Sequence, residues 1–209
     1  MKSIRIKMEE KITFDCHGLI LEGRLALGSS AKGVLITHPH PLYGGDMDNQ
    51  VVAAVAEAYQ SEGWSTLCFN FRGTGASEGR FDNGQGEQSD IEAAIAYLKS
   101  RGCQPIDMAG YSFGAWVLAG WSQNNPNHPH AIRLVAPPVA FIDFADIRSI
   151  PGLTQVVVGS RDEIAPCSII ESLMPLWQPK AAFNIIQQAD HFFGGYLQAL
   201  QEVIAQRIG

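Results

Sequence analysis

A five-residue pattern near the middle of the chain, Gly110-Tyr111-Ser112-Phe113-Gly114, constrains the fold more than any other feature. It follows the short, mostly apolar run 106–109 and precedes an apolar, helix-like stretch, which indicates a strand, a sharp turn and a helix. A residue at the tip of such a turn is held in a strained backbone conformation that aims its side chain outward. The residues two before and two after it approach so closely that side chains would collide, so both are glycine.

Two interpretations of Ser112 remain open on this pattern alone. In one, the turn is a glycine-rich link and the serine only caps the helix. In the other, the turn is a nucleophile elbow, which presents a reactive serine. The free N–H groups of the following helix would then face the serine, and the Phe113 amide would donate to an oxyanion formed on a substrate.

Runs that are typical of strands alternate with runs of helical periodicity along the chain. This alternation predicts an α/β fold with a mostly parallel central sheet and helices on both faces. The turn at His17-Gly18 predicts an antiparallel N-terminal hairpin before that sheet. The segment 139–151 is only a short connection, so no substantial lid is expected. The expected strands are 11–16, 19–27, 34–37, 65–71, 106–109, 131–135, 153–158 and 182–186, with helices after Asp48, around 91–98, and at 113–123, 169–176 and 195–207.

Length and charge limit the classes of function. A chain of 209 residues is long enough for one domain with a large core, and we expect a single domain over residues 1–209. The formal charge of −6 and the lack of a Lys/Arg run argue against nucleic-acid binding. Charged residues interrupt every apolar pair in residues 1–10, which is unlike a signal peptide. The apolar stretch 108–121 is shorter than the about 20 residues that span a bilayer. We therefore expect a cytoplasmic protein, monomer or homodimer, that binds neither nucleic acid nor membrane.

The cysteines and histidines do not form a metal-binding pattern. Cys16, Cys68, Cys103 and Cys167 are scattered singly, which indicates free thiols in a reducing compartment. His38 and His40 could begin a metal site, but no third ligand has suitable spacing. The sequence therefore predicts no metal and no cofactor.

Polar side chains that can do chemistry follow the predicted strands directly. Ligands of such sheets bind at the carboxyl ends of the strands, so these side chains can face one crevice. A nucleophilic serine needs a base, and the base needs a carboxylate that fixes its tautomer. Asp162 and His191 follow Ser112 in the order Ser…Asp…His, which is the order associated with this type of elbow. The residues placed in this way are His38, His40, Arg72, Ser112, Asp162 and His191.

Several of these roles have competing candidates. Glu163 and Asp190 compete with Asp162, but Asp190 adjoins His191, and sequence neighbours seldom orient each other as a triad requires. His38 precedes the serine and is expected to be a structural hydrogen-bonding group below the site. Arg72 could bind a carboxylate beside glycine amides, although a role in tying loops together is favoured. The remaining histidines are expected in a hairpin turn (His17) and solvated in a polar loop (His128 and His130).

With these residues in view, the chain resembles the α/β-hydrolase superfamily, and within it the small lidless bacterial serine hydrolases of the dienelactone-hydrolase-like and carboxylesterase-like kind. The resemblance covers nearly the whole chain from residue 11 onward. It implies a catalytic triad of Ser112, Asp162 and His191. The matching segments are His38 to Gly45 with Met47-Asp48-Asn49, Phe69 to Gly79, Gly110 to Gly114, Gly159 to Pro166, and Ala189 to Phe193.

One departure from the family pattern concerns the oxyanion hole. Many relatives carry His-Gly after the third strand, whereas this chain has His38-Pro39, and Pro41 follows. Proline has no N–H group, so neither proline can donate to an oxyanion. We therefore expect the amide of His40, between the two prolines, to be the second donor beside that of Phe113.

The expected activity is hydrolysis of a small-molecule carboxylic ester through a covalent acyl-enzyme. Thioester hydrolysis and small-amide or peptide hydrolysis use the same parts and stay open, as does a non-catalytic protein that binds small molecules. Aromatic residues near the site are candidates for lining a pocket, although aromatics at such spacing are often core. Tyr43 and Phe192 are the proposed substrate-binding residues, and Phe113 and Trp116 are further candidates.

Overall fold

The central sheet of the computed structural model, which describes residues 9–128 and 130–208, has eight strands in the order β1-β2-β4-β3-β5-β6-β7-β8. Strands β3 to β8 are parallel to one another, and β2 pairs antiparallel with β1 and β4. The expected mostly parallel sheet with an antiparallel N-terminal hairpin is confirmed. The strands are β1 (Glu9–Cys16), β2 (Leu19–Ala26), β3 (Gly33–Thr37), β4 (Ser65–Phe69), β5 (Ile106–Tyr111), β6 (Ile132–Val135), β7 (Leu153–Gly159) and β8 (Ala182–Ile186).

The hairpin turns at the predicted residues. His17 and Gly18 have φ values of 53° and 90°, the left-handed backbone that a tight turn between antiparallel strands requires. The ladder runs from Glu9 opposite Ala26 to Cys16 opposite Leu19, so it begins two residues before the expected Lys11. Residues 1–8, which carry most of the charged N-terminal pattern, lie outside the described residues.

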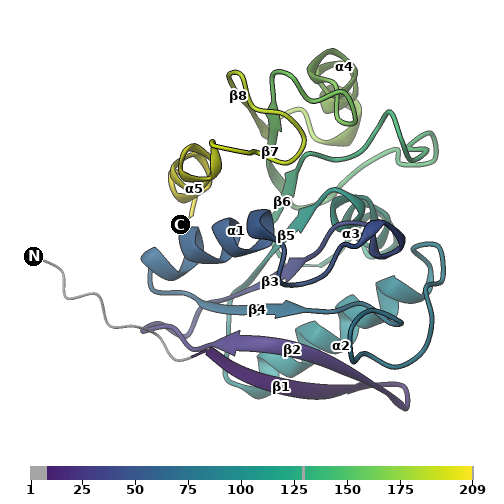
Figure 1. Ribbon diagram of the computed structural model, residues 1–209, viewed down its shortest axis with the longest axis vertical. Coiled ribbons are helices and arrows are strands. Elements are labelled where there is room, and N and C mark those ends of the chain that lie inside the picture. The colour runs from purple at the N-terminus through teal and green to yellow at the C-terminus, as the bar shows by residue number, and fades with distance from the viewer. Residues whose placement is uncertain (1–8, 129, 209) are drawn as a thin grey trace, which may run out of the picture.

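Helices cover both faces of the sheet (Figure 1). Helices α1 and α5 pack against each other on one face, while α2 and α3 pack together on the other. The helix expected after Asp48 begins at Gln50, with Asn49 as its N-cap, because the Asn49 side chain accepts a hydrogen bond from the Val51 amide at 2.9 Å. The helices are α1 (Gln50–Ser61), α2 (Gly86–Ser100), α3 (Phe113–Asn124), α4 (Cys167–Trp177) and α5 (Leu197–Ala205), with a 3₁₀ turn η1 (Pro41–Tyr43).

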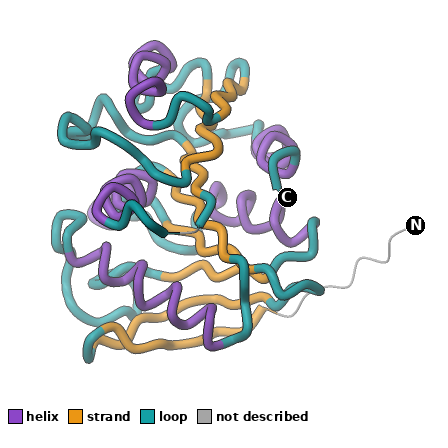
Figure 2. The backbone as a smooth tube through the Cα atoms, turned by 180° about the vertical axis from the view of Figure 1, so that it is seen from behind, coloured by secondary structure: helices purple, strands orange, loops and turns teal. Residues whose placement is uncertain are grey.

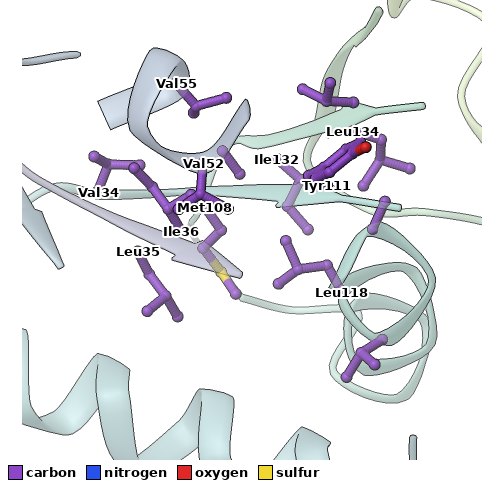
Figure 3. Packing of buried hydrophobic residues seen from close by; sticks show 14 of the residues in the cluster. Val34, Leu35, Ile36, Val52, Val55, Met108, Tyr111, Leu118, Ile132 and Leu134 are labelled. Atoms are coloured by element: carbon purple, nitrogen blue, oxygen red, sulfur yellow. The ribbon is translucent and has the colours of Figure 1, made fainter. Parts of the chain in front are cut away.

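The core lies on both sides of the central strands. Successive side chains of a strand point to opposite faces, so Val34 packs on the side of α1 and Leu35 on the other side (Figure 3). Val52 of α1 and Leu118 of α3 are fully buried against these two faces. Every residue of β3, β4 and β5 is buried, because helices flank the sheet along its length (Figure 2). A core of this kind makes the strand ends a rigid support for the loops that follow them.

The loops after β3, β5, β7 and β8 lie at one edge of the sheet because these strands are parallel. Residues 136–152, which connect β6 to β7, form only turns and extended chain. The described residues therefore form no substantial lid, as expected. Among the described residues, no helix is both long and apolar enough to cross a membrane.

Candidate active site

Ser112 occupies the turn between β5 and α3 in the strained conformation that the sequence predicts. Its φ and ψ are 52° and −118°, a region in which non-glycine residues are rarely found. A Cβ atom on Gly110 would lie 2.6 Å from the Gly114 carbonyl oxygen, and one on Gly114 would lie 2.8 Å from the His38 carbonyl oxygen. Both contacts are too short for any side chain, which explains the two glycines of the pattern.

Three residues from separate loops form a chain of hydrogen bonds at this turn. Nε2 of His191 lies 2.9 Å from Oγ of Ser112, and Nδ1 lies 2.9 Å from Oδ2 of Asp162. All three side chains are buried. The carboxylate accepts a hydrogen bond from Nδ1–H, so the proton stays on Nδ1 and Nε2 keeps a free lone pair directed at the serine hydroxyl. This is the arrangement in which a serine can pass its proton to an imidazole.

The carboxylate and the imidazole are each held by further hydrogen bonds. The amides of Ile164 and Ala165 donate to Oδ1 of Asp162 at 2.9 and 2.7 Å, and such donors hold a carboxylate in one orientation. The hydroxyl of Tyr111 donates to the His191 carbonyl at 3.0 Å. Burial raises the pKa of Tyr111, so this hydroxyl stays protonated and remains a donor. The Tyr111 bond thus holds the His191 loop against the strand that leads to Ser112, and the two amides hold the Asp162 carboxylate in place.

Neither of the two carboxylates that compete with Asp162 is hydrogen-bonded to the His191 ring. Asp190 accepts a hydrogen bond from the Phe192 amide at 3.0 Å, and Glu163 is exposed.

Arg72 forms a salt bridge with buried Asp90, at 2.7 Å between Nη2 and Oδ1. The favoured interpretation of Arg72, a side chain that ties loops together, therefore fits the structure better than an anion site.

The two amides expected to form the oxyanion hole are free to donate. Neither the His40 nor the Phe113 amide makes a hydrogen bond to another described residue. The backbone around them is nevertheless tied down, because the Gly114 amide donates to the His38 carbonyl at 3.1 Å and the Gly45 amide donates to the His40 carbonyl at 3.0 Å. The His38 loop and the start of α3 are therefore joined directly.

His38 lies below the site and holds the neighbouring peptide, as the structural interpretation of the sequence expects. Its Nε2 accepts from the Phe71 amide at 3.0 Å, so Nδ1 carries the proton and donates to the Pro39 carbonyl at 2.6 Å. Burial lowers the pKa of His38 to about 4, which keeps the ring neutral near pH 7. The Pro39 carbonyl and the His40 amide belong to one planar peptide, so the bond from His38 also orients that amide.

A cavity of about 300 Å³ opens above Ser112. Tyr43 and Phe192 line it, as proposed from the sequence, and so does Phe141, which sequence reasoning missed. Trp116 does not line it, and its Nε1 donates instead to the Asp143 carbonyl at 3.1 Å.

We call the buried Ser112, Asp162, His191 and His38 the floor, and the exposed Tyr43, Phe141 and Phe192 the rim. The full lining is Pro39, His40, Tyr43, Gly44, Gly45, Asn49, Tyr111, Ser112, Phe113, Phe141, Ile142, Ile164, His191 and Phe192.

A larger hollow of about 560 Å³ lies at the other end of α3, lined in part by Lys99, Trp121 and His128. The expectation that His130 is solvated there is wrong. His130 is only 7% exposed, because its ring lies beside Trp121 and its Nδ1 is 2.9 Å from the Ile106 carbonyl oxygen. None of the described residues that line this hollow is a serine, so the smaller cavity above Ser112 is the candidate active site.

Among the described residues, no group of three or more His, Cys, Asp or Glu side chains is arranged to hold a metal ion. The groups that the site presents are a hydroxyl, an imidazole, a carboxylate and two backbone amides.

Comparisons with known proteins agree with this geometry. The family described as serine aminopeptidase, S33, matches residues 42–175, a segment that contains Ser112 and Asp162. An uncharacterised protein of Rickettsia prowazekii, RP471, is 35% identical over 185 residues, which cover 83% of this chain and 77% of that protein.

Solved structures with the same fold match nearly the whole chain, as two examples show. An alpha-beta serine hydrolase homologue from Coxiella burnetii is 31% identical with a TM-score of 0.87, and the match covers 96% of this chain and 97% of that one. A protein from Xanthomonas campestris, described as a serine hydrolase without lid, is 27% identical with a TM-score of 0.86, over 95% and 92% of the two chains.

Proposed function

The chain belongs to the serine aminopeptidase S33 family of α/β hydrolases, and on that premise we propose that it hydrolyses small carboxylic esters with Ser112 as nucleophile. One observation carries the proposal, namely the continuous hydrogen-bond chain from Ser112 through His191 to Asp162. A serine that only capped a helix would need neither the imidazole nor the carboxylate behind it. The S33 relationship supports a hydrolase, and the substrate must be argued from the pocket.

The first half of the reaction forms an acyl-enzyme. Nε2 of His191 takes the hydroxyl proton as Oγ of Ser112 attacks the ester carbonyl carbon, and a C–O bond forms while the carbonyl oxygen becomes an oxyanion. The imidazolium that results is stabilised by Asp162, whose two oxygens lie 2.9 and 3.1 Å from Nδ1. The oxyanion then re-forms the carbonyl as the bond between the acyl carbon and the alcohol oxygen breaks, and His191 gives the proton to that alcohol oxygen.

The oxyanion is stabilised by the amides of Phe113 and His40. Donors that are already in place when charge develops are worth roughly 2.7–4 kcal/mol each in enzymes of this kind. The Phe113 amide is at the N-terminus of α3, where the helix dipole also favours negative charge. Neither amide donates a hydrogen bond to another described residue, so both are available to an oxyanion, which supports this role.

The second half of the reaction reverses the first with water in place of the alcohol. Water gives its proton to Nε2 of His191 and attacks the acyl carbon, and Ser112 recovers its proton as the acid leaves. The cavity reaches the surface without a covering helix, which gives water and a small ester direct access.

An ester is a better substrate for this pocket than a peptide with a free N-terminus. An aminopeptidase has to bind the ammonium group of its substrate, and a carboxylate is the usual partner for that charge. None of the described residues that line the cavity is an aspartate or glutamate. Asp162 lies behind His191, where it is buried and bonded to the imidazole, so its charge is already paired.

We further propose that the enzyme works in the cytoplasm without a cofactor. The cysteines Cys16, Cys68, Cys103 and Cys167 are all unpaired, which suits a reducing compartment.

A panel of substrates tests the proposal. Purified protein is assayed with p-nitrophenyl acetate and butyrate, the matching acyl thioesters and anilides, and the p-nitroanilides of alanine and leucine. We expect the highest kcat/KM for the esters and little or no cleavage of the amino-acid anilides. Faster cleavage of the anilides would favour an aminopeptidase, and no turnover of any substrate would favour a non-catalytic binding protein.

A further inference from the structure

The exposed aromatic residues of this protein gather at one place. Among the described residues, the exposed Phe, Tyr and Trp side chains are Tyr43, Phe141 and Phe192, at 74%, 54% and 56% exposure. All three line the cavity above Ser112. Apolar surface that stays in contact with water and lies around a pocket is a common mark of ligand binding.

Two of these rings form a corner with the ring of His40. Tyr43 and Phe141 meet edge to face, with centroids 5.4 Å apart and planes at 75°. The His40 ring lies 5.0 Å from Tyr43 at 83° and 6.5 Å from Phe141 at 78°. His40 also packs on Phe113 at 4.8 Å, so a continuous aromatic wall runs from the surface to the residue beside Ser112.

The polar atoms of this corner carry no full charge. Nδ1 of His40 accepts from the Leu42 amide at 3.3 Å, and burial lowers the pKa of the ring, so His40 is neutral near pH 7. No Lys, Arg, Asp or Glu lines the cavity in the part of the chain that the structure describes. A charged group placed there would lose water without gaining a partner, which disfavours it.

The triad determines which half of an ester meets the corner. The alcohol oxygen has to receive its proton from Nε2 of His191, so the alcohol half lies on the His191 side. Phe192 packs on His191 at 5.5 Å and belongs to that side. The corner of Tyr43, His40 and Phe141 lies on the other side of the site, next to Phe113. The acyl half of the ester is therefore the half that contacts this corner.

The size of the cavity sets an upper bound on that acyl group. A protein cavity of about 150 Å³ holds benzene, so about 300 Å³ has room for one ring and a short ester. A fused ring system or a long chain would extend beyond the rim.

We propose that Tyr43, His40 and Phe141 form an acyl subsite for a single uncharged aromatic ring, so that the preferred substrates are small esters of aryl-substituted acids. This inference rests on the proposed ester hydrolysis at Ser112. Aromatic pairs in edge-to-face or offset geometry gain about 0.5–1.5 kcal/mol beyond the area they bury. That gain corresponds to about a twofold to thirteenfold preference for an aromatic ring over a saturated ring of the same size.

A quaternary ammonium group is the other ligand that aromatic corners bind. Cation–π attraction is weak unless the cation loses its hydrating water. Tyr43 and Phe141 are both more than half exposed, so a cation between them would stay hydrated. An aromatic ring gains from contact area and ring geometry even at an open mouth, so it fits this corner better.

The test compares esters that differ only in the ring. Hydrolysis of methyl phenylacetate and methyl cyclohexylacetate is followed by acid release, and each kcat/KM is divided by the rate constant of that ester with hydroxide. We expect the corrected ratio of aromatic to saturated ester to be about five. Benzyl acetate and cyclohexylmethyl acetate place the same rings in the alcohol half, and the methyl ester of trimethylammonioacetate tests the cation.

Two variants and one control locate the effect. Tyr43→Leu and Phe141→Leu keep apolar bulk but remove a ring, and each is expected to lower the ratio toward one. Leu42→Ala removes apolar bulk from an exposed neighbour that does not line the cavity, and the ratio should stay at the wild-type value. Retention of the ratio in both ring variants would overturn the subsite.

The remaining outcomes separate this inference from the ester hydrolysis on which it rests. A ratio of one or less, a preference confined to the alcohol half, or preference for the trimethylammonio ester would each refute the aromatic acyl subsite while p-nitrophenyl acetate is still hydrolysed. A protein that hydrolyses none of these esters would refute the proposed function itself.

Discussion

The floor of the pocket and its rim are built from opposite kinds of residue. Ser112, Asp162, His191 and His38 are buried, and each has a hydrogen-bond partner that fixes its orientation. Tyr43, Phe141 and Phe192 are exposed and meet other side chains mainly through ring contacts. The floor is thus rigid, whereas the rim can adjust to a ligand.

This difference separates chemistry from selection. Bond making and breaking require atoms held within a few tenths of an ångström, which a buried hydrogen-bond network supplies. Choice among small apolar groups requires only contact, and one contact changes a rate by about tenfold. We therefore expect changes in the floor to affect all substrates alike, and changes in the rim to affect some substrates more than others.

The largest expected effect is that of His191→Ala. Loss of the base leaves Ser112 protonated, so kcat for p-nitrophenyl acetate and butyrate should fall by roughly four orders of magnitude or more. Both esters should lose activity by the same factor, because the base does not contact the acyl group. His17→Asn is the matched control, since asparagine tolerates the left-handed backbone at this turn and should retain wild-type turnover. Unequal losses for the two esters would break the separation of floor and rim.

A smaller effect is expected on acid stability, through His38. Histidine in an unfolded chain titrates near pH 6.5, whereas burial lowers the pKa of folded His38 to about 4. Between these values the unfolded chain binds more protons, so the stability that His38 contributes is complete above pH 6.5 and is lost as the pH falls toward 4. The free energy of unfolding should decrease by up to about 3 kcal/mol from this group.

Urea titrations at several pH values measure this contribution. The difference between wild type and His38→Asn should shrink as the pH falls from 6.5 to 4. Half-buried His40, whose pKa is also lowered by burial, should contribute less, so His40→Asn should change the slope less. Parallel pH profiles for wild type and His38→Asn would show that His38 is not held neutral in the floor.

The smallest expected effect belongs to the rim. Phe141→Ala should raise KM for methyl phenylacetate severalfold and change kcat little, because this ring contacts the substrate away from the reacting atoms. Steady-state kinetics measure both constants. A fall in kcat that matches the His191→Ala variant would place Phe141 in the floor.

The floor was open to prediction from the sequence because each of its residues carries a local signal, although the residues come from separate loops. The two glycines around Ser112 and the polar residues directly after strands reflect backbone constraints that a single sequence displays. His38 was interpreted correctly as a buried hydrogen-bonding residue. Asp162 was separable from Asp190 because adjacent residues rarely form a triad pair, and the structure brings Asp162 to His191.

The rim could be predicted only in part, because it depends on contacts between distant segments. Phe141 lies in the connection 136–152, which has no periodicity, and it meets Tyr43 only after that connection folds back over the sheet edge. Trp116 looked like a lining residue from its distance to Ser112 in sequence. The helix instead turns it toward the Asp143 carbonyl, on a different side of α3. His130 was likewise placed in solvent by its polar neighbours, although tertiary packing buries it.

Reaction with a fluorophosphonate probe tests the central claim, that the floor makes Ser112 a nucleophile. Such probes form a covalent bond only with an activated serine, so wild-type protein should gain one adduct, located on Ser112 by peptide mass spectrometry. Folded Ser112→Ala should gain none, and His191→Ala should react far more slowly. Equal labelling of wild type and Ser112→Ala, or no labelling of folded wild type, would contradict the account.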